Sequence, residues 1–367
     1  MSNLFSDFSI RNLKFKNRIV MPPMVCSDFT EEDGFFTLKN IERYRDRARG
    51  GVGLIIIEST CISKAGRLSP TQLGLWSDDH IKGFNRLAGY CRDYECKALA
   101  QIHHAGLAVA SGITDDPVAP SDFQGLSRSN QEIRARALSL DEIALIQDEY
   151  VAAAVRAQEA GLDGVELHGA CGQLISQFFS PFVNKREDNY GGNLVNRTRF
   201  ATEIISNIRQ TVGSDFIISC RIGCDEPDLE SSIQIAQVLE KAGIDMLHIS
   251  TGLTNYIAGE IVNVFVPAYF HYNSIVYRGT QIRQKVNIPV IVAHGIQTPV
   301  EADYLIEHDY ADFVAIGRGL LVDPEWANKG QQYLKVTPCL RCKTCSYHYK
   351  SSNCPQTKTK KFNKRYG

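Results

Sequence analysis

Eight short apolar runs rich in β-branched residues recur along the chain, and each is followed by a stretch with helical periodicity. This alternation is typical of βα units that build a parallel sheet. The runs begin at Arg18, Val52, Ala98, Gly164, Phe216, Asp245, Pro289 and Phe313. Because the runs are apolar almost throughout, we expect strands buried on both faces. That pattern favours a closed (β/α)8 TIM barrel over an open doubly wound sheet.

Composition narrows the class of protein further. With 367 residues, 44% apolar and 22% charged, the chain can bury a large core, and its net charge of -1 provides no overall field for nucleic acid or an acidic membrane. No signal peptide opens it and no run approaches the ~18 apolar residues of a membrane span. We therefore expect a cytoplasmic protein with no nucleic-acid or membrane partner. The oligomeric state, including a homo-oligomer, stays open.

We expect two parts of very different size. Residues 1–335 contain all eight runs and predict the barrel. Residues 336–367 carry a cluster of cysteines and a basic tail, which we interpret as a solvated end. Within the barrel, residues 106–138 and 253–277 are too long for plain βα links and predict lids or substrate walls. The aromatics of the second segment suit a planar conjugated ligand, or else pack outer helices.

Polar side chains close strand after strand at the same predicted end. They are Gln101, His103, His104, His168, Arg221, Ser250, Thr251, His294 and Arg318. A single histidine at such a place is more often structural. Six of the eight predicted strands end in such residues, which a structural role alone does not readily explain. In (β/α)8 barrels the catalytic and binding residues lie at the C-terminal ends of the strands.

The last two runs end in the glycine-containing stretches "AHGI" and "IGRGLL". Glycine lets backbone N–H groups approach a ligand, and barrels commonly bind phosphate at this place. A glycine after a strand is also an ordinary turn residue, so the signal alone is moderate.

The stretches "NRIVMPPM", "GVGLIIIES", "QIHHAG", "HGACGQLISQFFSPFVNKREDNYGGNLVNRTRF" and "IGRGLLVDPEW" resemble the old yellow enzyme family of FMN-dependent ene-reductases. The resemblance is greatest to the branch near bacterial 2,4-dienoyl-CoA reductase and trimethylamine dehydrogenase, and it covers Asn3 to Lys329. It implies hydride transfer from flavin N5 to an activated C=C bond.

The resemblance also implies which residues hold FMN. Those matching positions around the flavin ring are Pro23, Met24, Val25, Ser59, Gln101, His168 and Arg221. Those matching the phosphate site are Ala293, His294, Gly295, Gly317 and Arg318. Family members often place Cys or Thr where Val25 stands, and Cys26 comes one residue later. We therefore do not expect that thiol to tune the flavin.

The catalytic motif departs from the family at two of three positions. His168 is retained, but Cys171 replaces the second carbonyl-binding residue and Gln173 replaces the proton-donating tyrosine. A thiol is a weak donor and a carboxamide has no acidic proton. We expect His168 to be the main substrate donor. The α-carbon proton then comes from water or a loop tyrosine such as Tyr256, with Cys171 a feasible acid.

Four cysteines in the last thirty residues have the spacing C-x2-C-x2-C-x8-C: Cys339, Cys342, Cys345 and Cys354. Three close thiols and a remote fourth favour a [4Fe–4S] cluster over structural zinc, with unmetallated thiols as a third alternative. The cluster segments of the two relatives named above lie at a similar position.

The sequence leaves the electron route open. Those relatives continue into nucleotide-binding domains, whereas no G-x-G-x-x-G motif follows a strand here. We expect NAD(P)H to dock on FMN, or a separate electron-donor protein to act through the cluster. The expected substrate is small and apolar or aromatic, and conjugated. Two alternatives remain: a flavin dehydrogenase oxidising an amine or similar donor, and an FMN-binding electron-relay subunit that has lost alkene reduction.

Overall fold

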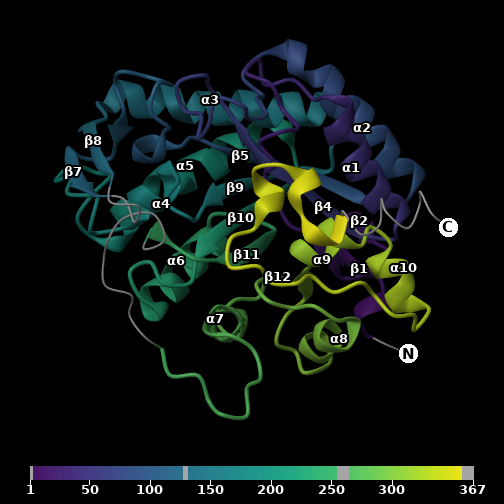
Figure 1. Ribbon diagram of the computed structural model, residues 1–367. Helices are drawn as coiled ribbons and strands as arrows, with labels where there is room; N and C mark the ends of the chain where they lie inside the picture. The colour runs from purple at the N-terminus through teal and green to yellow at the C-terminus, as the bar shows by residue number, and fades with distance from the viewer. Residues whose placement is uncertain (1–2, 127–130, 254–263, 358–367) are drawn as a thin grey trace.

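The computed structural model describes residues 3–126, 131–253 and 264–357, and its centre is a closed parallel barrel (Figure 1). The barrel strands are β3 (Ile19–Met21), β4 (Leu54–Cys61), β5 (Lys97–His103), β9 (Gly164–Gly169), β10 (Ile217–Gly223), β11 (Met246–Ser250), β12 (Val290–Val292) and β13 (Phe313–Ala315). They pair in chain order, and β13 pairs with β3 to close the ring. The predicted (β/α)8 barrel is confirmed, with one strand in each predicted run.

Helices surround the barrel. Those that follow barrel strands are α1 (Leu38–Arg49), α2 (Ile81–Asp93), α3 (Leu140–Glu159), α4 (Leu174–Phe179), α5 (Leu194–Val212), α6 (Leu229–Lys241), α7 (Ser274–Arg283), α8 (Pro299–Glu307), α9 (Arg318–Val322) and α10 (Trp326–Gln331). The ends of α3 illustrate how the sequence sets such boundaries. Ser139 and Glu142 form a reciprocal capping box, and Gly161 follows the last turn with φ +76°.

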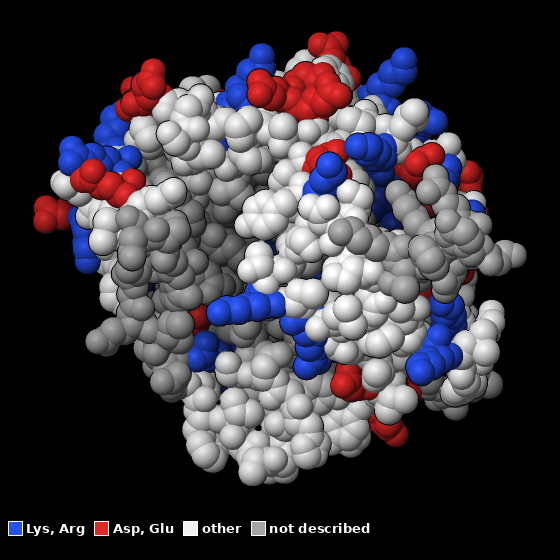
Figure 2. All heavy atoms as spheres, viewed as in Figure 1, with Lys and Arg blue, Asp and Glu red and all other residues white. Residues whose placement is uncertain are grey.

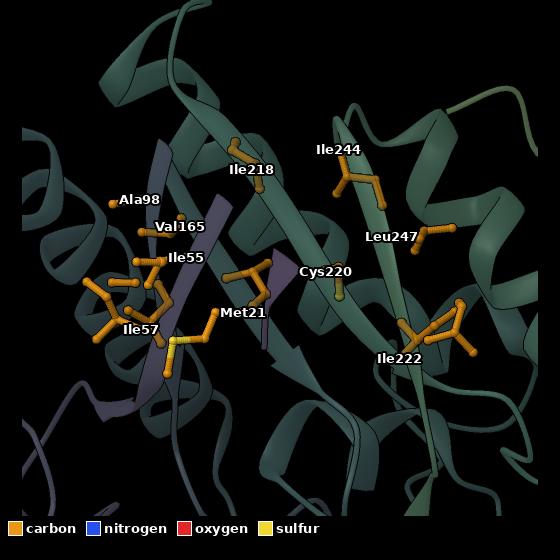
Figure 3. Close-up of a cluster of buried hydrophobic side chains, with 14 of the residues drawn as sticks. Met21, Ile55, Ile57, Ala98, Val165, Ile218, Cys220, Ile222, Ile244 and Leu247 are labelled. Carbon is orange, nitrogen blue, oxygen red and sulfur yellow. The ribbon is translucent and has the colours of Figure 1, made fainter. Parts of the chain in front are cut away.

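Apolar side chains cover both faces of the strands. In β4, Ile55 and Ile57 point outward into the layer beneath the helices, where Figure 3 shows them with Met21 and Val165. Leu54 and Ile56 belong instead to the core inside the barrel. This alternation follows from the two-residue period of a strand. It also explains why the runs look apolar throughout.

A β-hairpin closes the N-terminal end of the barrel. Its strands are β1 (Phe8–Ile10) and β2 (Leu13–Phe15), and the Phe15 ring meets Phe313 edge-on with centroids 5.3 Å apart. Arg11 in the turn forms an ion pair with Asp245, which precedes β11. With this end plugged, ligands must enter from the opposite end, where the strands finish.

The two long connections have different structures. The first forms a three-stranded sheet of β6 (Val118–Ala119), β7 (Phe123–Leu126) and β8 (Glu132–Ala137). In the second, Tyr256 lies outside the described residues. The Phe270 ring lies 5.2 Å from that of Tyr277 and 5.5 Å from that of Tyr310. For Phe270, packing on outer helices is therefore what the structure shows.

The cysteine-rich segment, residues 336–357, crosses the front of the barrel (Figure 1, yellow). It contains the short 3-10 helices Ser346–His348 and Ser351–Asn353. The Ser27 N–H donates to the His348 carbonyl at 2.9 Å, and His348 Nδ1 donates to the Val25 carbonyl at 2.9 Å. These bonds fix the segment to the loop after β3. The division of the chain at residues 335 and 336 stays a prediction.

Candidate active site

Inside the barrel, polar side chains lie in layers above the apolar floor. Leu99, Ile217 and Met246 belong to that floor. Two residues further along the same strands stand Gln101, Ser219 and His248, and β9 contributes Glu166. The Glu166 carboxylate accepts from Gln101 Nε2 at 2.8 Å, Ser219 Oγ at 3.4 Å and His248 Nδ1 at 3.0 Å. This buried network supports the next layer, which opens on the mouth.

His168 stands in that upper layer, at the end of β9. The side chain is buried, and its Nδ1 has no hydrogen-bond partner among the described residues. Burial lowers the pKa of His168 well below 6.5, and Arg221 and His103 lower it further. The ring is therefore neutral at physiological pH, with one N–H to donate and one nitrogen to accept. An unpartnered buried nitrogen is expensive, so it suggests a ligand.

Gln173, by contrast, is already engaged. Its side-chain oxygen accepts from His103 Nδ1 at 2.8 Å, and His103 Nε2 accepts from Gln72 Nε2 at 2.8 Å. Burial lowers the His103 pKa from 6.5 to about 4, which keeps this ring neutral too. The three side chains come from different parts of the barrel wall and hold one another in place. Gln173 is thus fixed and carries no acidic proton.

Cys171 occupies an unusual backbone conformation beside the barrel mouth. Its φ is +55°, in the left-handed region that non-glycine residues seldom adopt. Its Sγ lies 3.5 Å from Ser250 Oγ, which also accepts a hydrogen bond from Arg221 Nη2 at 3.0 Å. His294 has φ +84° and approaches the same hydroxyl at 3.5 Å. Such backbone strain concentrates at functional sites.

A cavity of about 320 Å³ lies over the C-terminal ends of the strands. Eight of the predicted FMN residues line it: Pro23, Met24, Arg221, Ala293, His294, Gly295, Gly317 and Arg318. Gly317 leaves this space open, because a Cβ there would lie 3.2 Å from Met24 Sδ. The Arg221 Nε is buried without a partner in the part of the chain that the structure describes. A ligand with hydrogen-bonding edges and a phosphate fits these features.

The remaining predicted residues lie outside the lining of that cavity. Ser59 is buried on β4, and its Oγ has no partner among the described residues, whereas Gln101 is paired with Glu166. Val25 contributes its carbonyl to His348. His168 and Arg221 lie opposite each other on the paired strands β9 and β10, which connects this group to the cavity.

The four clustered cysteines surround one small cavity. Cys339, Cys342, Cys345 and Cys354 all line it, and the first three also line the larger cavity. Within the described ranges, however, no three His, Cys, Asp or Glu side chains are arranged to hold a metal ion. The metal-binding role of the segment is therefore not confirmed.

Cys26 faces the segment as well. Its Sγ donates to the Tyr347 carbonyl at 3.0 Å and to Asp28 at 2.9 Å. Burial, and then Asp28, raise its pKa to about 12. The thiol therefore attaches the segment to the barrel. That it does not tune the flavin stays a prediction.

Several participants were not among the predicted site residues. Glu166 was detectable as a charged residue inside an apolar strand. Gln72 gave no such signal. Lys343 and His348 lie within the cysteine pattern, which drew attention to the thiols and not to the residues between them.

A profile of the "NADH:flavin oxidoreductase / NADH oxidase family" matches residues 3–336. The chain belongs to this family. It is an FMN-dependent oxidoreductase of the old yellow enzyme type, as the resemblance implied.

Curated relatives of this oxidoreductase differ in length. An NADH oxidase from Thermoanaerobacter brockii is 42% identical over 93% of the chain, and a metal reductase from Desulforamulus reducens is 36% identical over 93%. The chain spans about half of those two proteins (52% and 51%). An NADPH dehydrogenase from Halalkalibacterium halodurans is 35% identical, with 91% of the chain matching 95% of that protein.

Solved structures agree with the fold. An old yellow enzyme homologue from Zymomonas mobilis superposes with a TM-score of 0.79 at 26% identity, covering 96% of this chain and 99% of the other. A 2-naphthoyl-CoA reductase complex gives a TM-score of 0.83 at 24% identity, over 94% of this chain and 54% of that one. The second likeness concerns the fold alone.

Among the helices in the described part of the chain, none combines the length and the apolarity needed to cross a bilayer.

Proposed function

We propose that this oxidoreductase is an ene-reductase, acting on the C=C bond of an α,β-unsaturated carbonyl or enoate-type substrate. The observation that carries the proposal is His168, a neutral, buried imidazole fixed at a strand end beside Arg221. Its Nδ1 has no partner among the residues that the structure describes. Such a donor is suited to a carbonyl oxygen that gains negative charge during the reaction.

FMN would lie across the barrel mouth. Arg221 and the buried Ser59 hydroxyl would meet the ring, and the ends of β12 and β13, with Gly295, Gly317 and Arg318, would hold the phosphate. When bound, FMN supplies hydride to the β carbon of an activated alkene. The positive charge of Arg221 stabilises negative charge on the ring.

The chain's own residues would then divide two tasks. His168 binds the carbonyl oxygen and polarises the alkene. Gln173 is held by His103 and does not supply the proton. The proton reaches the α carbon from water or from Tyr256. Cys171, with Sγ beside Ser250, lies where the family binds the oxygen and is the less favoured acid.

We further propose that the four clustered cysteines bind a [4Fe–4S] cluster. A single zinc ion needs its ligands about 2.3 Å from one point, whereas a cubane has each thiolate on a different iron. Four cysteines spaced around one small cavity suit the second arrangement. The first three also line the larger cavity, which we call the FMN cavity. This position would give electrons a short route from a separate donor protein to FMN. Docking of NAD(P)H on FMN is the other electron route. We also propose that the protein is cytoplasmic.

Anaerobic photometry of the purified protein tests the function. We expect NADH or NADPH to bleach a flavin absorbance that an enone of small apolar or aromatic type then restores. Restoration by no enone, together with bleaching by an amine, would assign the protein to the flavin dehydrogenases. A protein that releases FAD, or never takes up FMN, would contradict the cofactor.

A further inference from the structure

Two residues between the first three clustered cysteines, Arg341 and Lys343, are basic. Arg341 lies between Cys339 and Cys342, and its Nη2 donates to the Gly295 carbonyl at 2.7 Å. Gly295 follows β12 and lines the FMN cavity. This bond fixes the turn of the cysteine-rich segment directly against the proposed phosphate site.

Lys343, two residues further, lines the same cavity. Throughout residues 3–126, 131–253 and 264–357, no hydrogen bond or ion pair involves its ammonium group. Among the described residues lining the cavity, Arg221, Arg318 and Lys343 are cationic, and none is a carboxylate. Figure 2 shows basic side chains at the centre of this face, beside its hollow. Apart from the proposed cluster ligands Cys339, Cys342 and Cys345, the charged side chains that line the cavity are therefore all positive, and they favour an anion.

The three cations are divided between two ends of the cavity. Arg221 lies on β10 beside Ser250 and His168, at the end proposed for the flavin ring. Arg318 follows β13, next to Gly317, at the end where barrels bind phosphate. The Arg341 bond to Gly295 places the Lys343 turn at that second end.

We propose that Lys343 binds the phosphate of FMN together with Arg318, so that the cysteine-rich segment is part of the cofactor site. This inference rests on the proposed function. A phosphate monoester carries up to two negative charges, and Arg318 balances only one of them. Lys343 supplies a second positive charge, on a flexible side chain.

The test compares FMN with riboflavin, which lacks the phosphate. The deflavinated full chain is titrated with each, and the dissociation constant is taken from quenching of flavin fluorescence. Lys343→Ala should raise the FMN dissociation constant about tenfold, the worth of one hydrogen bond to a charged group. It should leave riboflavin binding unchanged, and Lys343→Arg should retain most of the FMN affinity.

Lys350→Ala is the matched control. Lys350 is an exposed lysine of the same segment that lines neither cavity, so this variant should bind both flavins normally. Equal weakening of FMN and riboflavin by Lys343→Ala would overturn the proposal, because it would indicate a structural role. An unchanged FMN constant with a raised KM for NAD(P)H would overturn it by assigning the lysine to the electron donor. If the unmodified chain bound neither flavin, the proposed function itself would fail.

Discussion

At the scale of single residues, His168 and Gln173 differ in whether their polar atoms are already used. Within the described part of the chain, the buried His168 Nδ1 has no hydrogen-bond partner, whereas the Gln173 side-chain oxygen accepts from His103. Two residues of one short motif therefore have separate roles. The first is available to substrate, and the second stabilises the wall around it.

We predict that His168→Ala lowers the rate of alkene reduction by ~10²-fold or more, because a rigid donor to the developing oxyanion is lost. FMN should remain bound, which the flavin absorbance of the purified variant checks. Steady-state kinetics with NAD(P)H and an enone measure the rate.

Gln173→Ala is the control for that variant. Its effect on rate should be small, although the buried His103 N–H loses its partner and the free energy of unfolding should fall by about 1–3 kcal/mol. Gln173→Tyr should restore a proton donor and increase the rate. If Gln173→Ala slowed the enzyme as much as His168→Ala, the glutamine would be a substrate ligand.

At the scale of elements, the cysteine-rich segment and the loop after β3 behave as one unit. Cys26, Ser27 and Val25 all bond to residues 347–348 of the segment. The loop thus positions the cysteines close to the FMN cavity. A metal group there would exchange electrons over a short distance.

We predict that protein prepared without oxygen contains iron and acid-labile sulfide, about four of each per chain. Cys342→Ser should lose most of the iron because one of four thiolates is missing. Ser346→Ala, in the same segment, should retain it. Metal analysis giving one zinc per chain with no iron or sulfide would refute the cluster.

At the scale of the whole molecule, the barrel mouth buries several neutral histidines. Burial lowers the pKa of His103 and His294 to about 4 and that of His104 to about 3. Each has an ordinary value of 6.5. Between about pH 4 and pH 6.5 these histidines bind more protons in the unfolded chain than in the folded one, so for these groups lowering the pH through this range favours unfolding.

We therefore predict that the contribution of His103 to the free energy of unfolding is level above about pH 6.5 and is lost as the pH drops towards 4. The buried carboxyls of Glu149 and Glu226, whose pKa burial raises to about 7, act in the opposite direction. For the fully buried His103 the loss is on the order of 3 kcal/mol. Urea denaturation at several pH values measures it. His103→Gln should flatten the dependence, whereas His271→Gln, at an exposed position, should not. The same pH dependence in the unmodified chain and in His103→Gln would contradict this account.

The sequence predicted most of the architecture and part of the site. Local patterns were sufficient for the strands, since each run is only a few residues long and is apolar almost throughout. The glycines after β12 and β13 were recognisable for the same reason. The pairing of Gln173 with His103 was not, because the two residues are 70 apart in the chain.

The chain's sequence by itself determined the barrel, its family and the end at which its polar residues gather, because strand periodicity and strand-end chemistry are local properties. Only the tertiary structure decided which of those residues are free. Closing the ring pairs His103 with Gln173 and leaves His168 Nδ1 without a partner among the described residues. It also brings Lys343 and Arg318 to the lining of one cavity. Contacts of this kind depend on how distant segments meet, and no local pattern carries that information.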